Sequence, residues 1–297
     1  MKVLKKCGWF VVSLLPVLLF FVIQVGASFV SIFVYMFLHY GDGLTQAELT
    51  MRAGEWAIEN IMYLTLVMQI AAFLVFGIWY YFAYGKKKRP GHVEEPGGRQ
   101  IAAIVLLGVL LQVVVSGALN LISEVAPGAL EEYQELLENS GMMETSALVL
   151  LSVVIMAPIV EEILCRGIVF RLAKHVSVKF WVANVIQALL FGVLHANLVQ
   201  GIYAFVFGLV LGYVYGKYER IWMCMLLHGV INFSSAIVSL LWGMLFLAGR
   251  GLAMTFMVVA MAAAVAGILY CIKEELGPVA KVPETAAISK SELEEIE

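Results

Sequence analysis

The chain has 297 residues, of which 62% are hydrophobic and 14% are charged, and its formal net charge is -3. A water-soluble domain of this length almost never has this balance, so the composition excludes most soluble classes and predicts an integral membrane protein surrounded by lipid. Because unpaired backbone groups find no water in hydrocarbon, each crossing should be a helix of roughly 20 apolar residues or a strand of a closed barrel. The small net charge offers no basic face, so we expect no nucleic-acid partner.

Long unbroken apolar runs favour helices and predict an all-α membrane protein, a bundle of about eight transmembrane helices. If the N-terminus lies in the cytoplasm, all of the 19 lysines and arginines fall on the inner side except Arg52 and Arg250. The positive-inside rule requires this bias, so both termini are predicted to be cytoplasmic. The eight runs cover about residues 9–38, 61–84, 101–123, 146–165, 180–198, 201–216, 221–247 and 252–272.

The predicted helices divide the chain into four parts. Residues 1–144 would hold transmembrane helices one to three with their loops. A core over residues 145–247 would hold helices four to seven, and one last helix would follow over residues 248–272. The tail, residues 273–297, is rich in glutamate and poor in aromatic residues, so disorder is expected there.

Short amphipathic helices and a basic loop are expected between the spans. Thr45 and Glu48 fit a capping box that opens one short helix, and residues 127–141 predict another that begins at Pro127. Both are interpreted as solvated or interfacial helices at the outer surface. The basic run at residues 86–89 lies in an inner loop, where it can meet anionic lipid headgroups.

Ionisable side chains inside apolar runs are rare in this sequence. Insertion into hydrocarbon costs about 2.5 to 3.5 kcal/mol for each charged group, so function is the usual reason to keep one there. Glu161 and Glu162 are the only acidic residues inside a run, and His195 and His228 are the histidines within spans five and seven. The sequence therefore predicts that these four residues form a buried titratable set.

Helical spacing suggests a role for each residue near Glu161. Glu162 and Arg166 are four residues apart, so they share a helix face and can pair. Glu161 is turned about 100° away from Glu162. Without that local partner, it is the better candidate for a general base. The alternative is that Glu162 and Arg166 form only a structural salt bridge at the membrane boundary.

A second pair lies in span seven. His228 and Asn232 are also four residues apart, and two adjacent donors suit a developing oxyanion. Phe191 lies one turn before His195 and could orient its imidazole, which could then share a water with Glu161. Counting along the helices places His195 farther from the inner surface than Glu161 or His228, so a tilted or late-starting fifth helix is expected. Each histidine alone could instead be a hydrogen-bond partner between helices.

Three motifs in this order resemble a known family. EEILCRG (161–167) resembles EExxxR, FGVLH (191–195) resembles FxxxH, and HGVIN (228–232) resembles HxxxN of the CAAX protease and bacteriocin-processing (CPBP) family, also called Abi. The linking segment is similar too, and it carries Gly208, Gly212 and Gly216 at every fourth position, where small residues permit close helix approach. The resemblance covers about residues 145–240.

The resemblance implies an all-helical intramembrane endopeptidase that acts on a membrane-associated peptide or protein. By this analogy Glu161 activates a water with help from His195, while His228 and Asn232 stabilise the oxyanion. The other two residues of the first motif, Glu162 and Arg166, would hold it in shape. Family members include prenyl-protein proteases and bacterial proteins tied to bacteriocin immunity, so a bacterial plasma membrane is implied while the substrate is not.

Zinc is left open as a cofactor. The family is often described as metalloproteases, and Glu161, His195 and His228 are a legitimate catalytic zinc set. However, HExxH is absent, and Glu161 cannot be both a zinc ligand and an unhindered base. A metal-free mechanism with a glutamate-activated water stands beside the zinc mechanism.

Other functions are weighed against the peptidase. A non-catalytic relative could bind a partner through the same residues, as an immunity protein would. A transporter could use the buried acid as a proton site, although the two-half repeat typical of that class is not visible. A rhomboid-like serine protease needs GxSxG, and Ser28 lacks the second glycine. An aspartyl type needs two buried aspartates, which the spans lack. The sequence does not indicate an oligomeric state.

Overall fold

The computed structural model describes residues 2–85, 95–140, 146–177, 179–247 and 251–276. Every regular element in these ranges is helical, and no strand occurs within them. The elements are α1 (Lys2–Leu38), α2 (Gln46–Glu59), α3 (Ile61–Tyr80), η1 (Tyr81–Gly85), α4 (Gly98–Val125), η2 (Pro127–Leu130), α5 (Glu131–Asn139), α6 (Ala147–Val149), η3 (Leu150–Met156), α7 (Ala157–Glu162), η4 (Ile163–Val169), α8 (Phe170–Ala173), α9 (Phe180–Val193), α10 (Leu198–Tyr218), α11 (Ile221–Leu247) and α12 (Gly251–Leu276).

The predicted all-α membrane bundle is confirmed. Among the described residues, seven helical stretches are long and apolar enough to cross a membrane. The eighth predicted span, 180–198, differs: α9 has 14 residues, about 21 Å of helix, against a hydrocarbon core of about 30 Å. The basic run at 86–89 and the tail from 277 lie outside the described residues. The seven stretches are Leu4–Leu38, Ile61–Gly85, Gly98–Val125, Ala147–Ala173, Leu198–Tyr218, Ile221–Trp242 and Thr255–Lys273.

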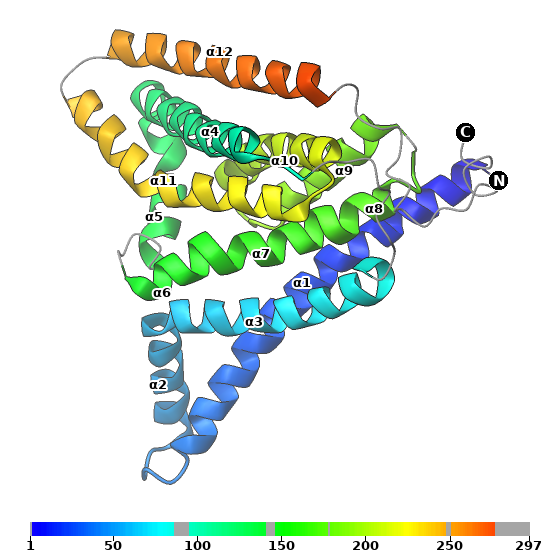
Figure 1. The fold of residues 1–297 in the computed structure, drawn as a ribbon. Coiled ribbons are helices and arrows are strands. Elements are labelled where there is room, and N and C mark those ends of the chain that lie inside the picture. The colour runs from blue at the N-terminus through cyan, green and yellow to red at the C-terminus, as the bar shows by residue number, and fades with distance from the viewer. Residues whose placement is uncertain (1, 86–94, 141–145, 178, 248–250, 277–297) are drawn as a thin grey trace.

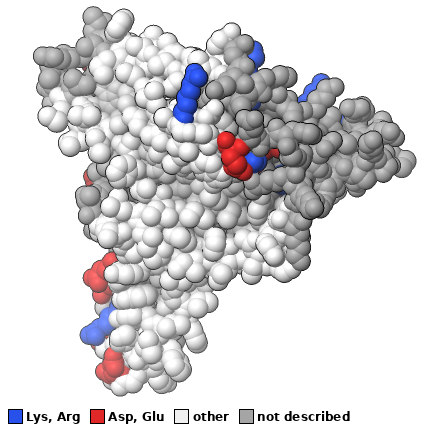
Figure 2. Space-filling model, viewed as in Figure 1, with Lys and Arg blue, Asp and Glu red and all other residues white. Residues whose placement is uncertain are grey.

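The long helices run roughly side by side, and the short helices α2 and α5 run across them at one end of the bundle (Figure 1). At the opposite end α1 begins, α12 ends and the connection from α8 to α9 turns back (Figure 1). Figure 2 shows a broad zone of uncharged side chains between charged ones at the lower left and others at the upper right. This distribution fits helices that cross an apolar layer and end in water on both sides.

Local sequence explains where the two short helices begin. Thr45 caps α2 with a capping box, in which the Thr45 hydroxyl accepts from the Glu48 amide and the Glu48 carboxylate accepts from the Thr45 amide at 2.8 Å. The second expected short helix is present as η2 followed by α5, with Pro127 in the first turn of η2. Both short helices expected from sequence are therefore confirmed.

The fourth span is longer and less regular than the predicted 146–165. It runs without interruption over Ala147–Ala173 and contains two π-helical segments, η3 and η4. In η3 the amide of Ala157 donates to the Ser152 carbonyl, five residues back. π-helical turns are rare and are frequent at functional sites. All residues of η4 are buried, so this span forms the centre of the bundle.

Glycines allow the helices around this central span to approach closely. A Cβ atom at Gly208 in α10 would lie 2.9 Å from the Ala188 Cα in α9, and one at Gly192 in α9 would lie 2.6 Å from the Gly201 carbonyl oxygen. No real side chain tolerates such distances without a shift of the backbone. The expectation that glycines of α10 permit close approach is confirmed at Gly208 and Gly212.

Candidate active site

The site contains a buried ion pair between Glu162 and Arg166. The carboxylate of Glu162 accepts a hydrogen bond from Arg166 Nη1 at 2.9 Å, and both side chains are fully buried. The same Glu162 oxygen lies 2.9 Å from Nδ1 of His228, on α11. A carboxylate can only accept, so Nδ1 carries the hydrogen of this bond. The predicted pair of Glu162 and Arg166 is therefore present, and it also fixes His228.

The guanidinium of Arg166 also contacts two further helices, α10 and α9. Its Nη2 donates to the backbone carbonyl of Gly208 in α10 at 3.2 Å. Its plane lies over the ring of Phe191 in α9, with the guanidinium carbon 4.7 Å from the ring centroid. A planar group with several donors suits this arrangement, which a lysine ammonium could not reproduce.

The ring of Phe191 contacts the imidazoles of both His195 and His228. Its ring packs edge-to-face against His195, with centroids 5.1 Å apart, and against His228, with centroids 5.6 Å apart. His195 Nδ1 lies 2.9 Å from the carbonyl of Phe191, which can only accept. In a neutral imidazole Nε2 of His195 is therefore the unprotonated nitrogen, free to accept a hydrogen bond.

The predicted location of His195 within a span needs correction. α9 ends at Val193, and His195 lies in the turn between α9 and α10. Ala196 follows with φ 52°, and the side chain of Asn197 caps α10 by accepting from the Gln200 amide at 3.0 Å. The chain turns here because Asn197 is a strong N-cap, a signal that the sequence did contain.

Glu161 is the carboxylate left free. Its Oε2 is buried and has no hydrogen-bond partner, while the side chain as a whole keeps 18% of its surface exposed. Oε2 lies 4.0 Å from Nε2 of His228. The two ring nitrogens of His228 thus face two different glutamates, Glu162 in direct contact and Glu161 across a slightly larger gap. Glu162 Oε2 also has no hydrogen-bond partner, but Glu162 is fully buried, so Glu161 is the carboxylate of the two that a water or a substrate can reach.

Asn232 has a structural partner that the sequence reasoning missed. Its Nδ2 donates to the backbone carbonyl of Val153 in η3 at 2.8 Å. In the π-helical register this carbonyl would receive the amide of residue 158, which is a proline and has no N–H. Asn232 replaces the missing donor, and the remaining hydrogen of its amide group stays free for another acceptor.

A buried amide network supports the site from α9 and α10. Gln187 Nε2 donates to the Gly208 carbonyl at 2.8 Å and lies 2.7 Å from Asn184 Oδ1, and Asn184 Nδ2 donates to the Leu209 carbonyl at 3.0 Å. The Gly208 carbonyl therefore accepts from both Gln187 and Arg166. Sequence reasoning did not find these residues, although two amides in an apolar run, NVIQ, were a visible signal.

The predicted zinc ligands do not form a set at ligand distance. Over the described residues, no group of three or more His, Cys, Asp or Glu side chains is placed to hold a metal. Both nitrogens of His228 are directed to glutamates, and the ring of Phe191 lies against both His195 and His228. This geometry does not fit a zinc site.

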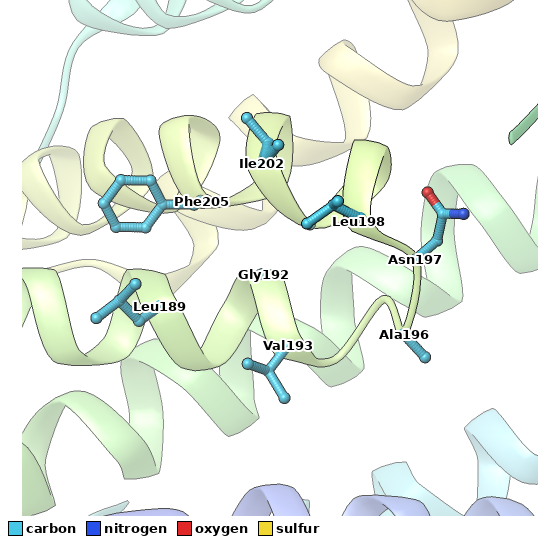
Figure 3. A pocket seen from close by; sticks show the side chains of 9 residues that line it. Leu189, Gly192, Val193, Ala196, Asn197, Leu198, Ile202 and Phe205 are labelled. Atoms are coloured by element: carbon cyan, nitrogen blue, oxygen red, sulfur yellow. The ribbon is translucent and has the colours of Figure 1, made fainter. Parts of the chain in front are cut away.

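An apolar groove lies beside His195. Its volume is about 530 Å³, and it lies between the end of α9 and the start of α10, where Figure 3 shows the side chains around it. Five of its lining residues are exposed on the bundle surface: Leu189, Val193, Ala196, Leu198 and Ile202. The groove is therefore open toward the surroundings of the helices, and Ala196 connects it to the turn that carries His195.

Comparison with known proteins agrees with this geometry. Residues 143–234 match the family model described as type II CAAX prenyl endopeptidase Rce1-like, and this range contains all six predicted site residues. Over this region the chain is similar to the CPBP family. The matched region coincides with the central span and the helices that supply the cluster, in a multi-pass integral membrane protein.

The chain is 32% identical over 78 residues to a protein of Bacillus subtilis (strain 168) named "Putative membrane peptidase YdiL". The alignment covers 26% of this chain and 32% of the relative, so the chain spans about a third of the length of the curated relative that it matches. No solved structure matches the chain.

Proposed function

We propose that this protein is a CAAX-protease-like intramembrane endopeptidase in which Glu161 activates a water for attack on a peptide bond. One observation carries the proposal. Both adjacent glutamates have a buried Oε2 with no hydrogen-bond partner, but Glu162 is fully buried and held through Oε1 by Arg166 and His228. Glu161 is the partly exposed one, and its Oε2 lies 4.0 Å from His228 Nε2. A free carboxylate next to an imidazole suits general base catalysis.

Side chains of this protein can carry out every proton transfer in the proposed hydrolysis. Glu161 takes a proton from the water as the water oxygen forms a bond to the scissile carbonyl carbon. The carbonyl oxygen becomes an oxyanion, for which the spare amide hydrogen of Asn232 is a proposed donor, together with His228 Nε2 when both ring nitrogens of His228 carry a hydrogen. Collapse of the tetrahedral intermediate breaks the C–N bond, and the proton held on Glu161 passes to the leaving amine. His195, whose Nε2 can accept a hydrogen bond, would help to hold the water.

Zinc remains a separate proposal about the cofactor. Three ligands drawn from Glu161, His195 and His228 would have to move closer together to bind it. The hydrolysis steps proposed for Glu161 need no metal. Metal analysis of the purified protein, together with activity after dialysis against a chelator, decides between the two mechanisms. The glutamate mechanism expects full activity without zinc.

The substrate is proposed to be a membrane-associated peptide or protein, and the location to be a bacterial plasma membrane. The family model is named for prenylated CAAX proteins and the relative for a membrane peptidase. The groove beside His195 is apolar and open at the bundle surface, which supports an apolar substrate segment that arrives laterally. This gives a substrate class and leaves the sequence of the cleavage site to experiment.

The decisive test compares peptides in membranes of cells that produce the protein or its Glu161→Gln variant. Loss of a general base should slow cleavage by about 100-fold or more. We expect products that are present with the unaltered protein and absent with Glu161→Gln. Glu59→Gln, at an exposed position of α2, is the matched control and should behave like the unaltered protein. Identical peptides with Glu161→Gln would overturn the proposal and favour a partner-binding relative.

A further inference from the structure

Two neighbouring carbonyls of the central span are held by side-chain amides from two different helices. In Figure 1, α3 and α11 lie on opposite sides of this span, and both pack against η3 and α7. From α11, Asn232 donates to the Val153 carbonyl at 2.8 Å. From α3, Gln69 Nε2 donates to the Ser152 carbonyl at 3.2 Å, and the Ser152 hydroxyl donates back to Gln69 Oε1 at 2.8 Å. Gln69 lies outside the three motifs and outside the region matched by the family model.

The pair of Gln69 and Ser152 is a contact of fixed geometry inside an apolar layer. Ser152 is fully buried, and Gln69 keeps only 6% of its surface exposed. A backbone carbonyl can only accept, so the amide nitrogen of Gln69 must face it and the amide oxygen must face the hydroxyl. These polar groups find no water in hydrocarbon, so the two bonds hold α3 against η3 in one orientation.

This pair acts on the residue that defines the register of η3. The Ser152 carbonyl also accepts from the backbone amide five residues later, which is the bond of a π-helix. The register decides which carbonyl loses its donor at Pro158. An α-helical bond from this position would end at Val154, whereas a π-helical bond would end at Val153. Val153 is the residue to which Asn232 donates, so the orientation of Asn232 depends on the π-helical register.

We propose that Gln69 is a positioning residue of the site, which holds η3 in the π-helical register through its two bonds to Ser152. This register places the Val153 carbonyl that orients Asn232. The inference rests on the proposed function, in which the spare amide hydrogen of Asn232 stabilises the oxyanion. A shift of the Val153 carbonyl turns the whole planar amide group, so it also moves the spare hydrogen away from the oxyanion.

The test measures kcat and KM for a synthetic peptide that carries the cleavage site found in the membrane comparison, with the full-length protein in proteoliposomes. Gln69→Met keeps the length of the side chain and removes both bonds. Because a displaced oxyanion donor weakens binding of the transition state alone, kcat should fall about ten-fold while KM stays unchanged. Asn232→Ala should lower kcat about 100-fold. The double variant should match Asn232→Ala alone, because Gln69 acts through Asn232.

The matched control is a second buried pair of glutamine and serine, which lies within one helix. In α4, Gln112 Nε2 donates to Ser116 Oγ at 2.9 Å, and both residues are buried. Gln112→Met and Ser116→Ala should leave kcat unchanged. Ser152→Ala removes one of the two bonds of Gln69 and should lower kcat about three-fold. If Gln69→Met does not insert into the membrane, the comparison of Ser152→Ala with Ser116→Ala decides.

Three results would each overturn the inference: a kcat of Gln69→Met equal to that of Gln112→Met, a change in KM alone, or effects of Gln69→Met and Asn232→Ala that multiply. Inactivity of Glu161→Gln on the same peptide would show that the proposed function survives such a result. Reversible unfolding in mixed micelles provides a readout that needs no cleavage. Asn232→Ala should cost less stability in the Gln69→Met protein than in the unaltered one, and equal costs would also overturn the inference.

Discussion

At the scale of single residues, Pro158 explains why an asparagine stands at position 232. Proline leaves the Val153 carbonyl without a backbone donor inside the membrane, where an unsatisfied carbonyl costs several kcal/mol. Asn232 supplies the donor from another helix at 2.8 Å. The same bond fixes α11 against η3 and so sets the position of His228, one turn earlier.

This pairing can be tested by a double-mutant cycle. Asn232→Ala should lower the free energy of unfolding by about 1–3 kcal/mol, because it leaves the buried Val153 carbonyl without a donor. In a Pro158→Ala background, which restores the backbone N–H, the same change should cost about half as much or less. Reversible unfolding in mixed micelles measures both values. Equal costs in the two backgrounds would show that Asn232 does not replace the missing amide.

Lys174 is a second residue whose environment predicts a measurable effect. It follows α8 directly, 1% of its surface is exposed, and its ammonium has no hydrogen-bond partner. It lies 5.0 Å from the centre of the Phe170 ring. Burial lowers the pKa of Lys174 to about 7, and the nearby charge of Glu219 offsets only part of this shift.

The lowered pKa gives a pH dependence of stability. Between about pH 7 and 10 the unfolded chain keeps this proton while the folded protein loses it, so its contribution to stability rises with pH. Lys174→Met should therefore raise the melting temperature by a few degrees at pH 6, and the gain should shrink toward pH 10. Lys179→Met, at an exposed position, is the control and should have no effect. A gain in melting temperature that does not change with pH would contradict the lowered pKa of Lys174.

At the scale of elements, the local pairs were predictable and the contacts between helices were not. The Glu162 and Arg166 pair follows from spacing along one helix. The bond from Glu162 to His228 joins residues 66 positions apart, and the π-helical segments on either side of α7 change the angle between successive side chains. A regular α-helical count therefore could not show which glutamate faces His228. α9 ended earlier than predicted because hydrophobicity continues through a turn that Asn197 initiates.

The contact between α9 and α10 makes a strong prediction for Gly208. A methyl group there would lie 2.9 Å from the Ala188 Cα and 3.3 Å from Phe191, whose ring orients both imidazoles. Gly208→Ala should destabilise the protein by about 1–3 kcal/mol and lower activity further, because Phe191 and the carbonyl that holds Arg166 must both shift. Melting temperature and peptide cleavage are the measurements.

Gly267→Ala in α12 provides the matched control, because no atom lies within 4 Å of the added methyl group. It removes a helical glycine without a clash, so stability should stay the same or rise slightly. Equal behaviour of the two variants would mean that the close approach of α9 and α10 is unimportant for the site.

At the scale of the whole molecule, the distribution of charge predicts how the bundle is oriented in the membrane. Basic side chains gather at the end of the bundle where α1 begins, α8 meets α9 and α10 meets α11, as the positive-inside rule expects for a cytoplasmic surface. The short helices α2 and α5 lie at the opposite end (Figure 1). The contact between Tyr133 of α5 and Tyr203 of α10 would then lie toward the outer side.

Cysteine labelling in intact cells tests this orientation. Cys165 and Cys224 are buried, whereas Cys7 and Cys271 are exposed. In a variant with serine at positions 7 and 271, we expect a membrane-impermeant maleimide to label Arg52→Cys in α2 and Glu135→Cys in α5 without permeabilisation. In the unaltered protein it should reach Cys7 only after the membrane is opened. The reverse pattern would invert the topology and place α5, with its tyrosine contact to α10, on the cytoplasmic side.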